Sequence, residues 1–145
     1  MRISEVLANK PIQNVVTISP EATVRELVAL LAEHNVGALV VSPDGLAVAG
    51  IVSERDVVRH LGNDESVLDS PVSAIMTVEV RTAEPSEALH ELMQLMTDHR
   101  IRHVPVLVEG SLAGIISIGD VVKSRMSELE FERDQLDSFV HSQQT

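Results

Sequence analysis

The sequence contains no cysteine and has almost no aromatic residues. Among its 145 residues there is no tryptophan or tyrosine, and both phenylalanines lie within the last fifteen positions. Without cysteine the chain cannot form disulfides, use thiolate chemistry or hold zinc through sulfur. Its core must therefore be built from aliphatic residues and methionine, and the hydrophobic content of 44% is sufficient for a globular protein.

Positive charge is also scarce. Eleven Lys and Arg residues oppose 22 Asp and Glu residues, which gives a net charge of −11. This balance argues against nucleic acid and against an anionic membrane surface, because both require clustered cations. No apolar run has the length of a signal peptide or a membrane span. We therefore expect a cytoplasmic protein with no nucleic-acid or membrane partner.

What the sequence does contain is a repeat. The segment Gly50-Ile-Val-Ser53-Glu-Arg-Asp56-Val-Val is followed 64 residues later by Gly114-Ile-Ile-Ser117-Ile-Gly-Asp120-Val-Val. Each segment has the pattern of a buried strand that turns at a serine and enters a helix. Self-similarity at a fixed period indicates a duplicated structural unit.

The flanking sequence repeats in the same register. Each copy predicts a short strand (15–18 and 78–82), a helix with one apolar face, a buried strand (38–41 and 103–107), a turn, and a return strand (46–52 and 112–116) that leads into a second helix. Thr23 and Glu26 form a capping-box pattern, and Val24, Leu27, Val28 and Leu31 share one helical face.

We therefore predict an α/β (α+β) fold of two βαββα repeats related by a pseudo-twofold axis. One repeat has too few residues to bury its own helices, so the two are expected to share one core. The expected boundaries are 1–62 for the first repeat, 63–70 for an acidic linker, 71–126 for the second repeat and 127–145 for a helical extension.

The extension continues the last helix without Gly or Pro. Val122, Met126, Leu129, Leu136 and Val140 follow alternating steps of four and three, with Arg133 interrupting them. Two interpretations remain equal: the helix folds back on its own domain, or it contacts another subunit.

Ser53 with Asp56, and Ser117 with Asp120, have two compatible interpretations. A serine at the N-cap and an acid three residues later stabilise the start of a helix. A helix start also presents free N–H groups to a phosphate, and an aspartate one turn in can accept from both hydroxyls of a ribose. Arg102 and His103 stand together at the start of a strand, where an arginine is suited to phosphate recognition.

These residues carry a family resemblance. Thr82, the Arg102-His103-Val104-Pro105 strand entry and the junction at Ser117 and Asp120 resemble a cystathionine-β-synthase (CBS) domain. Thr17 and the junction at Ser53 and Asp56 resemble a second one. The chain up to about residue 126 is thus similar to a tandem CBS pair, or Bateman module, of the small bacterial kind without a catalytic domain.

The resemblance implies two clefts between the repeats that bind AMP, ADP, ATP, NAD or S-adenosylmethionine as a regulatory ligand. By position, Asp56 and Asp120 would hold the ribose, Ser53 and Ser117 would lie at the phosphates or sugar edge, and Thr17 and Thr82 would line the base pocket. Arg102 and His103, beside Pro105, would meet phosphate. The first copy has Gly37, Ala38 and Val40 where the second has these three residues, so Arg55 is its only evident substitute and we expect unequal sites.

The resulting hypothesis is a non-catalytic sensor that passes its bound state to a homodimer or an unidentified partner protein. The alternative is a structural or protein-interaction module with empty clefts, in which the junctions serve only as helix caps. Four histidines (34, 90, 99 and 103) have no cysteine or suitably spaced carboxylate beside them, so we predict no metal site.

Overall fold

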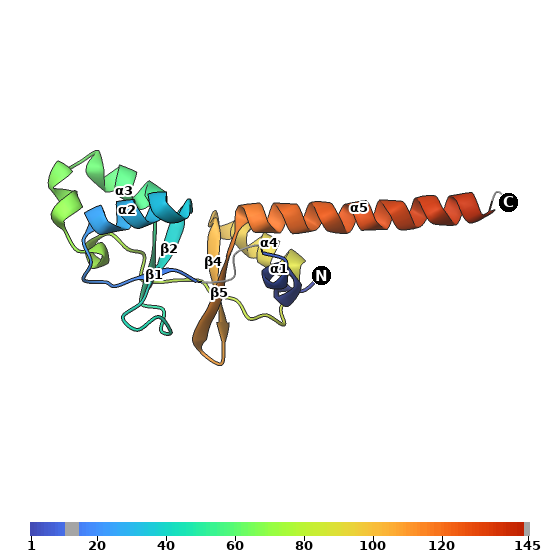
Figure 1. The fold of residues 1–145 in the computed structure, drawn as a ribbon, viewed down its shortest axis with the longest axis horizontal. Coiled ribbons are helices and arrows are strands. Elements are labelled where there is room, and N and C mark those ends of the chain that lie inside the picture. Colours follow the sequence, from blue (N-terminus) through green and yellow to red (C-terminus); the bar gives the residue numbers. More distant parts are fainter. Residues whose placement is uncertain (11–14, 144–145) are drawn as a thin grey trace.

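The structure is a computed structural model that describes residues 1–10 and 15–143. The two repeats lie side by side, and one long helix leaves the second (Figure 1). In chain order the elements are α1 (Ile3–Ala8), β1 (Thr17–Ile18), α2 (Val24–His34), β2 (Ala38–Val41), β3 (Gly50–Ser53), α3 (Glu54–Leu61), the 3₁₀ helices η1 (Glu65–Asp69) and η2 (Val72–Ala74), α4 (Leu89–His99), β4 (His103–Val108), β5 (Ser111–Ser117) and α5 (Ile118–Gln143).

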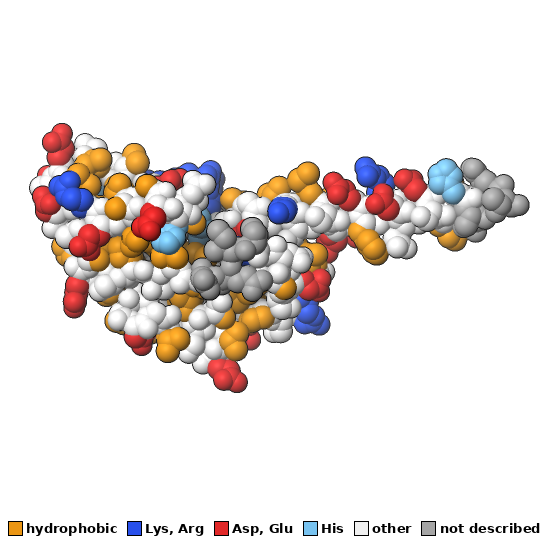
Figure 2. All heavy atoms as spheres, in the orientation of Figure 1, with side chains coloured by type: hydrophobic (Ala, Val, Ile, Leu, Met, Phe, Trp, Pro, Cys, Tyr) orange, Lys and Arg blue, Asp and Glu red, His pale blue; other side chains and the backbone are white. Residues whose placement is uncertain are grey.

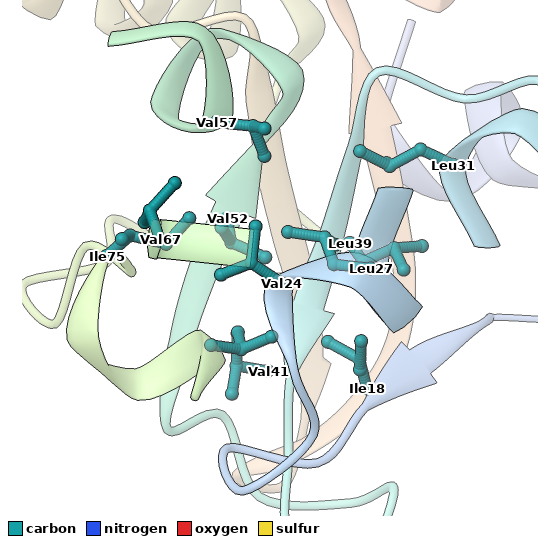
Figure 3. Packing of buried hydrophobic residues seen from close by; sticks show 11 residues of the cluster. Ile18, Val24, Leu27, Leu31, Leu39, Val41, Val52, Val57, Val67 and Ile75 are labelled. Carbon is teal, nitrogen blue, oxygen red and sulfur yellow. The ribbon is translucent and has the colours of Figure 1, made fainter. Parts of the chain in front are cut away.

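The first half is a three-stranded sheet in the order β1-β2-β3, with α2 and α3 packed on it. β1 runs parallel to β2, and β2 runs antiparallel to β3. All four residues of β2 are buried, as a central strand requires. Figure 3 shows aliphatic side chains from the sheet and helices converging in this core, and its members include Ile18, Val24, Leu27, Leu39, Val41, Val52 and Val57.

The second half repeats this arrangement around the antiparallel pair β4-β5. Its core contains Leu89, Leu92 and Met96 from α4, with Val104, Val106 and Ile116 from the strands. The predicted apolar faces of α2 and α4 are therefore confirmed, except that Val28 is 41% exposed. The fold class and the duplicated organisation are likewise as predicted, but each half has its own core where a single shared core was expected.

The two halves exchange short helical segments, which the sequence did not predict. Ile3 and Val6 of α1 are buried in the core of the second half, whereas Val72 and Ile75 are buried in the core of the first. Matching hydrogen bonds secure both segments: the N–H of Val24 donates to the carbonyl of Ser70, and the N–H of Leu89 to that of Met1, each at 2.9 Å. This correspondence is the pseudo-twofold relation between the halves.

The predicted capping box is present at the start of α2. The Thr23 hydroxyl accepts from the N–H of Glu26 at 3.1 Å, and the Glu26 carboxylate accepts from the N–H of Thr23 at 3.3 Å. In the second hairpin, Glu109 and Gly110 both have positive φ, which is the backbone form of a tight two-residue turn. These local signals position the strands that lead into the two serine–aspartate junctions.

The predicted strand at 78–82 is wrong. A single parallel bridge joins Ala83 to Val106, and Val78 is 68% exposed. Extending that pairing two residues back to Arg81 would need an N–H from residue 105, which is a proline and has none. In the first half the equivalent residue is Val40, and there β1 forms.

Two further segments differ from expectation. The return strand predicted at 46–52 is shorter, since β3 begins at Gly50, and the carbonyl of Leu46 instead accepts the N–H of Leu112 from the other half at 2.8 Å. Within the acidic stretch 63–70, the 3₁₀ helix η1 buries Val67 in the first core. Because the segment is mostly polar and acidic, its sequence did not indicate that Val67 would be buried.

Candidate functional site

The first serine–aspartate junction is a reciprocal cap at the start of α3. Oδ2 of Asp56 accepts from the backbone N–H of Ser53 at 2.8 Å and from its hydroxyl at 3.0 Å. The Ser53 hydroxyl accepts in turn from the N–H of Asp56 at 3.3 Å. Both residues are half-buried, so the carboxylate is held in one orientation at the end of β3.

The second junction has the same geometry and one additional partner. Oδ2 of Asp120 accepts from the N–H of Ser117 at 2.9 Å, and the Ser117 hydroxyl accepts from the N–H of Asp120 at 3.2 Å. Nζ of Lys10 lies 2.9 Å from the same Oδ2 and donates to the carbonyl of Ile115 at 2.7 Å. Lys10 thus connects the segment after α1 to β5 and to the start of α5.

Lys10 replaces a backbone contact found in the first half. There the carbonyl of Ile51, which is equivalent to Ile115, accepts the N–H of Thr77 at 2.9 Å. The sequence analysis missed Lys10, because an isolated lysine followed by proline gives no periodic or motif signal. Leu7 lies over Gly114 in the second half as Met76 lies over Gly50 in the first. With the two halves aligned in this way, Glu79 occupies the position in the first half that Lys10 occupies in the second.

Each aspartate keeps one carboxylate oxygen uncommitted to its cap. Across residues 1–10 and 15–143, the hydrogen bonds to Asp56 and Asp120 side chains all go to Oδ2. Each Oδ1 therefore remains able to accept from a ligand hydroxyl. Capping and ligand binding are compatible in this geometry.

The charge state of Asp120 follows from its surroundings. Burial would raise its pKa, but the hydrogen bonds from the Ser117 backbone and from the Lys10 ammonium outweigh burial. The net result is a pKa below the ordinary value of 3.8. Asp120 is therefore an anion at neutral pH, paired with a cation that Asp56 lacks among the described residues.

His103 of the second half reaches the first half. A β-carbon placed on Gly37 would lie 3.5 Å from Nε2 of His103 and 3.6 Å from Oε1 of Glu54, so the glycine leaves room for the ring. Burial lowers the pKa of His103 below 6.5, against the opposing effect of the Glu54 and Asp120 carboxylates. The positive charges of Lys10 and Arg102 also lower the pKa of His103.

The other predicted site residues divide by exposure. Arg55, Thr82 and Arg102 are exposed, whereas Thr17 is half-buried in β1. Pro105 is buried within β4, and its carbonyl accepts the N–H of Ala83 at 3.0 Å. Its side chain lies on the opposite face of the strand from Val104 and Val106, which belong to the core of the second half. The structure thus brings Ser117, Asp120, His103 and Lys10 together, with Ser53 and Glu54 across the seam between the halves.

Two cavities lie beside α5. One of about 170 Å³ separates it from α1 and is lined partly by Lys10, Asp120, Lys123, Ser124 and Ser127. The other, of about 500 Å³, lies between α4 and α5 and is lined partly by His90, Gln94, Arg125 and Glu128. Asp120 therefore borders a cavity on its α1 side as well as the boundary between the two halves.

Comparison with known proteins identifies the repeat. A family model described as the CBS domain matches twice, at residues 3–63 and 72–127. The chain belongs to the CBS-domain family. Both CBS domains of the chain contain one serine–aspartate junction, and the short segments α1 and η2 lie at the start of their respective matches.

The chain is similar to other proteins that contain CBS domains. A CBS-domain protein from Burkholderia ambifaria is 43% identical, with a TM-score of 0.82 over 88% of this chain and 95% of that one. The mitochondrial CBS domain-containing protein CBSX3 of Arabidopsis thaliana is 41% identical over 123 residues, which are 81% of this chain and 60% of that protein. A crystal structure of CBSX2 in complex with AMP has a TM-score of 0.75 at 25% identity, over 87% of this chain and 96% of that one.

Proposed function

We propose that the chain is a regulatory module that binds an adenosine-containing nucleotide between its two CBS domains and transmits the bound state to a partner. The observation that carries this proposal is the pair of capped aspartates, each held at the start of a helix with Oδ1 available. A ribose offers two adjacent hydroxyls to such an acceptor. The AMP complex of the related CBSX2 supports this ligand class.

We assign the individual roles as follows. Asp56 and Asp120 accept from the ribose, with Ser53 and Ser117 beside the phosphate or sugar edge, and Thr17 and Thr82 border the base. Arg102, His103 and Lys10 face the phosphate at the second site, and Arg55 serves the first. None of these residues is given a catalytic role.

The second site should bind phosphate more tightly. The second site contains Lys10, Arg102 and His103. At the equivalent positions the first site has Glu79, Gly37 and Ala38, none of which is basic. The loss of one charge-assisted hydrogen bond costs about 1.5–3 kcal/mol, or roughly tenfold to a hundredfold in affinity. AMP, ADP, ATP and NAD carry phosphate and should distinguish the two sites, while S-adenosylmethionine should not.

The helix α5 is the proposed output. It begins at Ile118, directly after Ser117, so a ligand that fixes Asp120 also fixes the first turn of a 26-residue helix. A ligand shifts this equilibrium only by its different affinity for the two conformations.

A cytoplasmic location, and the identity of the regulated protein, remain predictions from the sequence. No helix within the described residues is long and apolar enough to span a membrane.

A thermal-shift and calorimetric panel of AMP, ADP, ATP, NAD and S-adenosylmethionine tests the proposal. A ligand present at a hundred times its Kd should stabilise the protein by about 2.7 kcal/mol. Asp120→Asn should abolish the tighter site and Asp56→Asn the weaker one, and each variant is the matched control for the other. If no adenine nucleotide changes the melting temperature, the alternative of a ligand-free interaction module is correct.

A further inference from the structure

The helix α5 has an apolar seam that its own domain leaves exposed. Val121 and Ser124 near its start are buried against the body, with exposed fractions of 1% and 8%. From Leu129 to His141 all side chains are exposed. Figure 1 shows this part running out from the second half, and Figure 2 shows hydrophobic side chains at its surface.

The exposed residues form a coiled-coil repeat. The seam is defined by Val122, Met126, Leu129, Leu136 and Val140, which are 47–66% exposed, with Arg133 completing the steps of four and three. On a helical wheel the seam lies opposite Ser124, which faces the body. The seam is therefore left uncovered by the domain from which α5 emerges.

We propose that the occupant of this seam is α5 of a second copy of the chain, packed in the antiparallel direction. In a coiled coil, the residues of one seam insert between those of the other and bury both. The arrangement of charges and a crosslinking experiment distinguish this proposal from a parallel pair. A measurement of mass distinguishes it from binding of a different protein.

One antiparallel register uses every seam residue. With Val122 opposite Val140 of the second copy, Met126 lies opposite Leu136, and Leu129 lies opposite Arg133. The aliphatic part of the Arg133 side chain can cover a leucine while its guanidinium reaches the edge of the seam. Shifting either helix by one heptad leaves at least one end of the seam unpaired.

Charge favours this direction. Lys123 lies beside Asp137 of the second copy, and Arg133 lies beside Glu130 of the second copy, so each attraction occurs twice. Two pairs of like charge oppose this direction: Glu130 lies beside Glu130 of the second copy, and Glu132 beside Glu132 of the second copy, near the twofold axis. The two arginines 133 offset the Glu130 pair.

The parallel direction is less favourable. It sets Arg133 against Arg133 in the centre of the seam and Glu132 beside Asp137 twice. The attraction between Arg125 and Glu130 also occurs twice in the parallel pair, but it competes with Glu128, which already pairs with Arg125 within the chain. Like charges that face each other directly across such an interface are destabilising.

The first experiment measures the mass of the full chain by light scattering at increasing concentration. We expect a dimer that Leu129→Glu weakens by about a hundredfold or more, because two glutamates enter the apolar seam. Phe131→Glu is the matched control, since Phe131 is 65% exposed but lies opposite the seam. A monomer at all concentrations, or a dimer that survives Leu129→Glu, overturns the proposal.

The second experiment determines direction, and the absence of native cysteine makes it clean. A mixture of Val122→Cys and Val140→Cys chains should form an intermolecular disulfide upon oxidation, whereas Leu129→Cys alone should not. In a parallel pair these two positions would lie about 27 Å apart, at 1.5 Å per residue, beyond the reach of a disulfide. Self-crosslinking of Leu129→Cys with no product from the mixture would refute the antiparallel direction.

Discussion

At the residue scale, the two aspartate junctions are nearly identical in sequence and differ in their surroundings. The pattern Ser-x-x-Asp was sufficient to predict both caps, and the expectation of unequal sites rested on Arg102 and His103. Neither the Lys10 contact nor the space that Gly37 leaves for His103 could be predicted. Both depend on segments that are distant in the chain and meet only in the folded protein.

Replacing Lys10 should destabilise the protein measurably. In Lys10→Met the half-buried Asp120 carboxylate and the Ile115 carbonyl lose their donor, and we expect a loss of about 1–2 kcal/mol after allowance for solvent. Urea denaturation at pH 7 measures it. Arg25→Met is the control, because the Arg25–Asp69 pair is 64% and 77% exposed and should contribute less than about 0.5 kcal/mol.

The same Lys10 comparison has a defined pH dependence. Because folding lowers the pKa of Asp120, its contribution is present above the ordinary value of 3.8 and is lost as the pH falls through the folded value. The difference between wild type and Lys10→Met should therefore shrink below about pH 4. A difference that stays constant down to pH 2 would contradict the assignment.

His103 should titrate below the ordinary histidine value. Its pKa is lowered from 6.5 by burial, so the folded protein favours the neutral ring. Its contribution to stability is present above pH 6.5 and is lost as the pH falls through the folded pKa. An NMR titration of the ring proton, assigned with His103→Gln, measures the pKa directly. Addition of AMP should raise it, and an unchanged value would remove His103 from the phosphate site.

At the element scale, the sequence was most informative where the hydrophobic pattern was long. The helices α2 and α4 and the strands β2, β4 and β5 follow the predicted segments, because burial and period agree there. The strand at 78–82 failed because Pro105 removes the hydrogen-bond donor it would need. The six-residue helix α1 was missed because its apolar residues are too few to show a helical period.

The two glycines at the starts of the junctions should respond differently to alanine. A β-carbon on Gly50 would lie 2.8 Å from the Thr77 carbonyl oxygen and 2.7 Å from Sδ of Met76. One on Gly114 would lie 2.8 Å from Cδ2 of Leu7, which is the end of a flexible side chain. We expect Gly50→Ala to cost about 2–3 kcal/mol and Gly114→Ala less than about 1 kcal/mol. Urea denaturation that gave equal losses would mean that the Thr77 backbone can move.

At the scale of the whole molecule, the exchanged segments make the two halves interdependent. Ile3 and Val6 complete the second core from the far end of the chain, and Val72 and Ile75 complete the first. The domain boundaries predicted from the repeat period therefore divide the sequence without separating two independent cores. Periodicity in a sequence reports similarity between segments, and it does not report which core each segment enters.

Removing residues 1–10 should weaken the half that lies furthest along the chain. Burial of Ile3 and Val6 contributes roughly 1.5–3 kcal/mol for each side chain. Hydrogen exchange followed by mass spectrometry should show lost protection in β4 and β5, with β2 and β3 as the internal control. If the truncated chain is too unstable, Ile3→Ala should give a milder form of the same pattern. Equal losses in both halves would contradict this prediction.

The exchange of α1 and η2 also bears on how the chain arose. A half-length ancestor with this architecture would have formed a homodimer in which the N-terminal segment of each subunit completed the core of the other. Joining two such genes end to end would then preserve every interlocking contact and change only the covalent connection. In the present protein each half still depends on the N-terminal segment of the other, since Ile3 and Val6 complete the second core and Val72 and Ile75 complete the first.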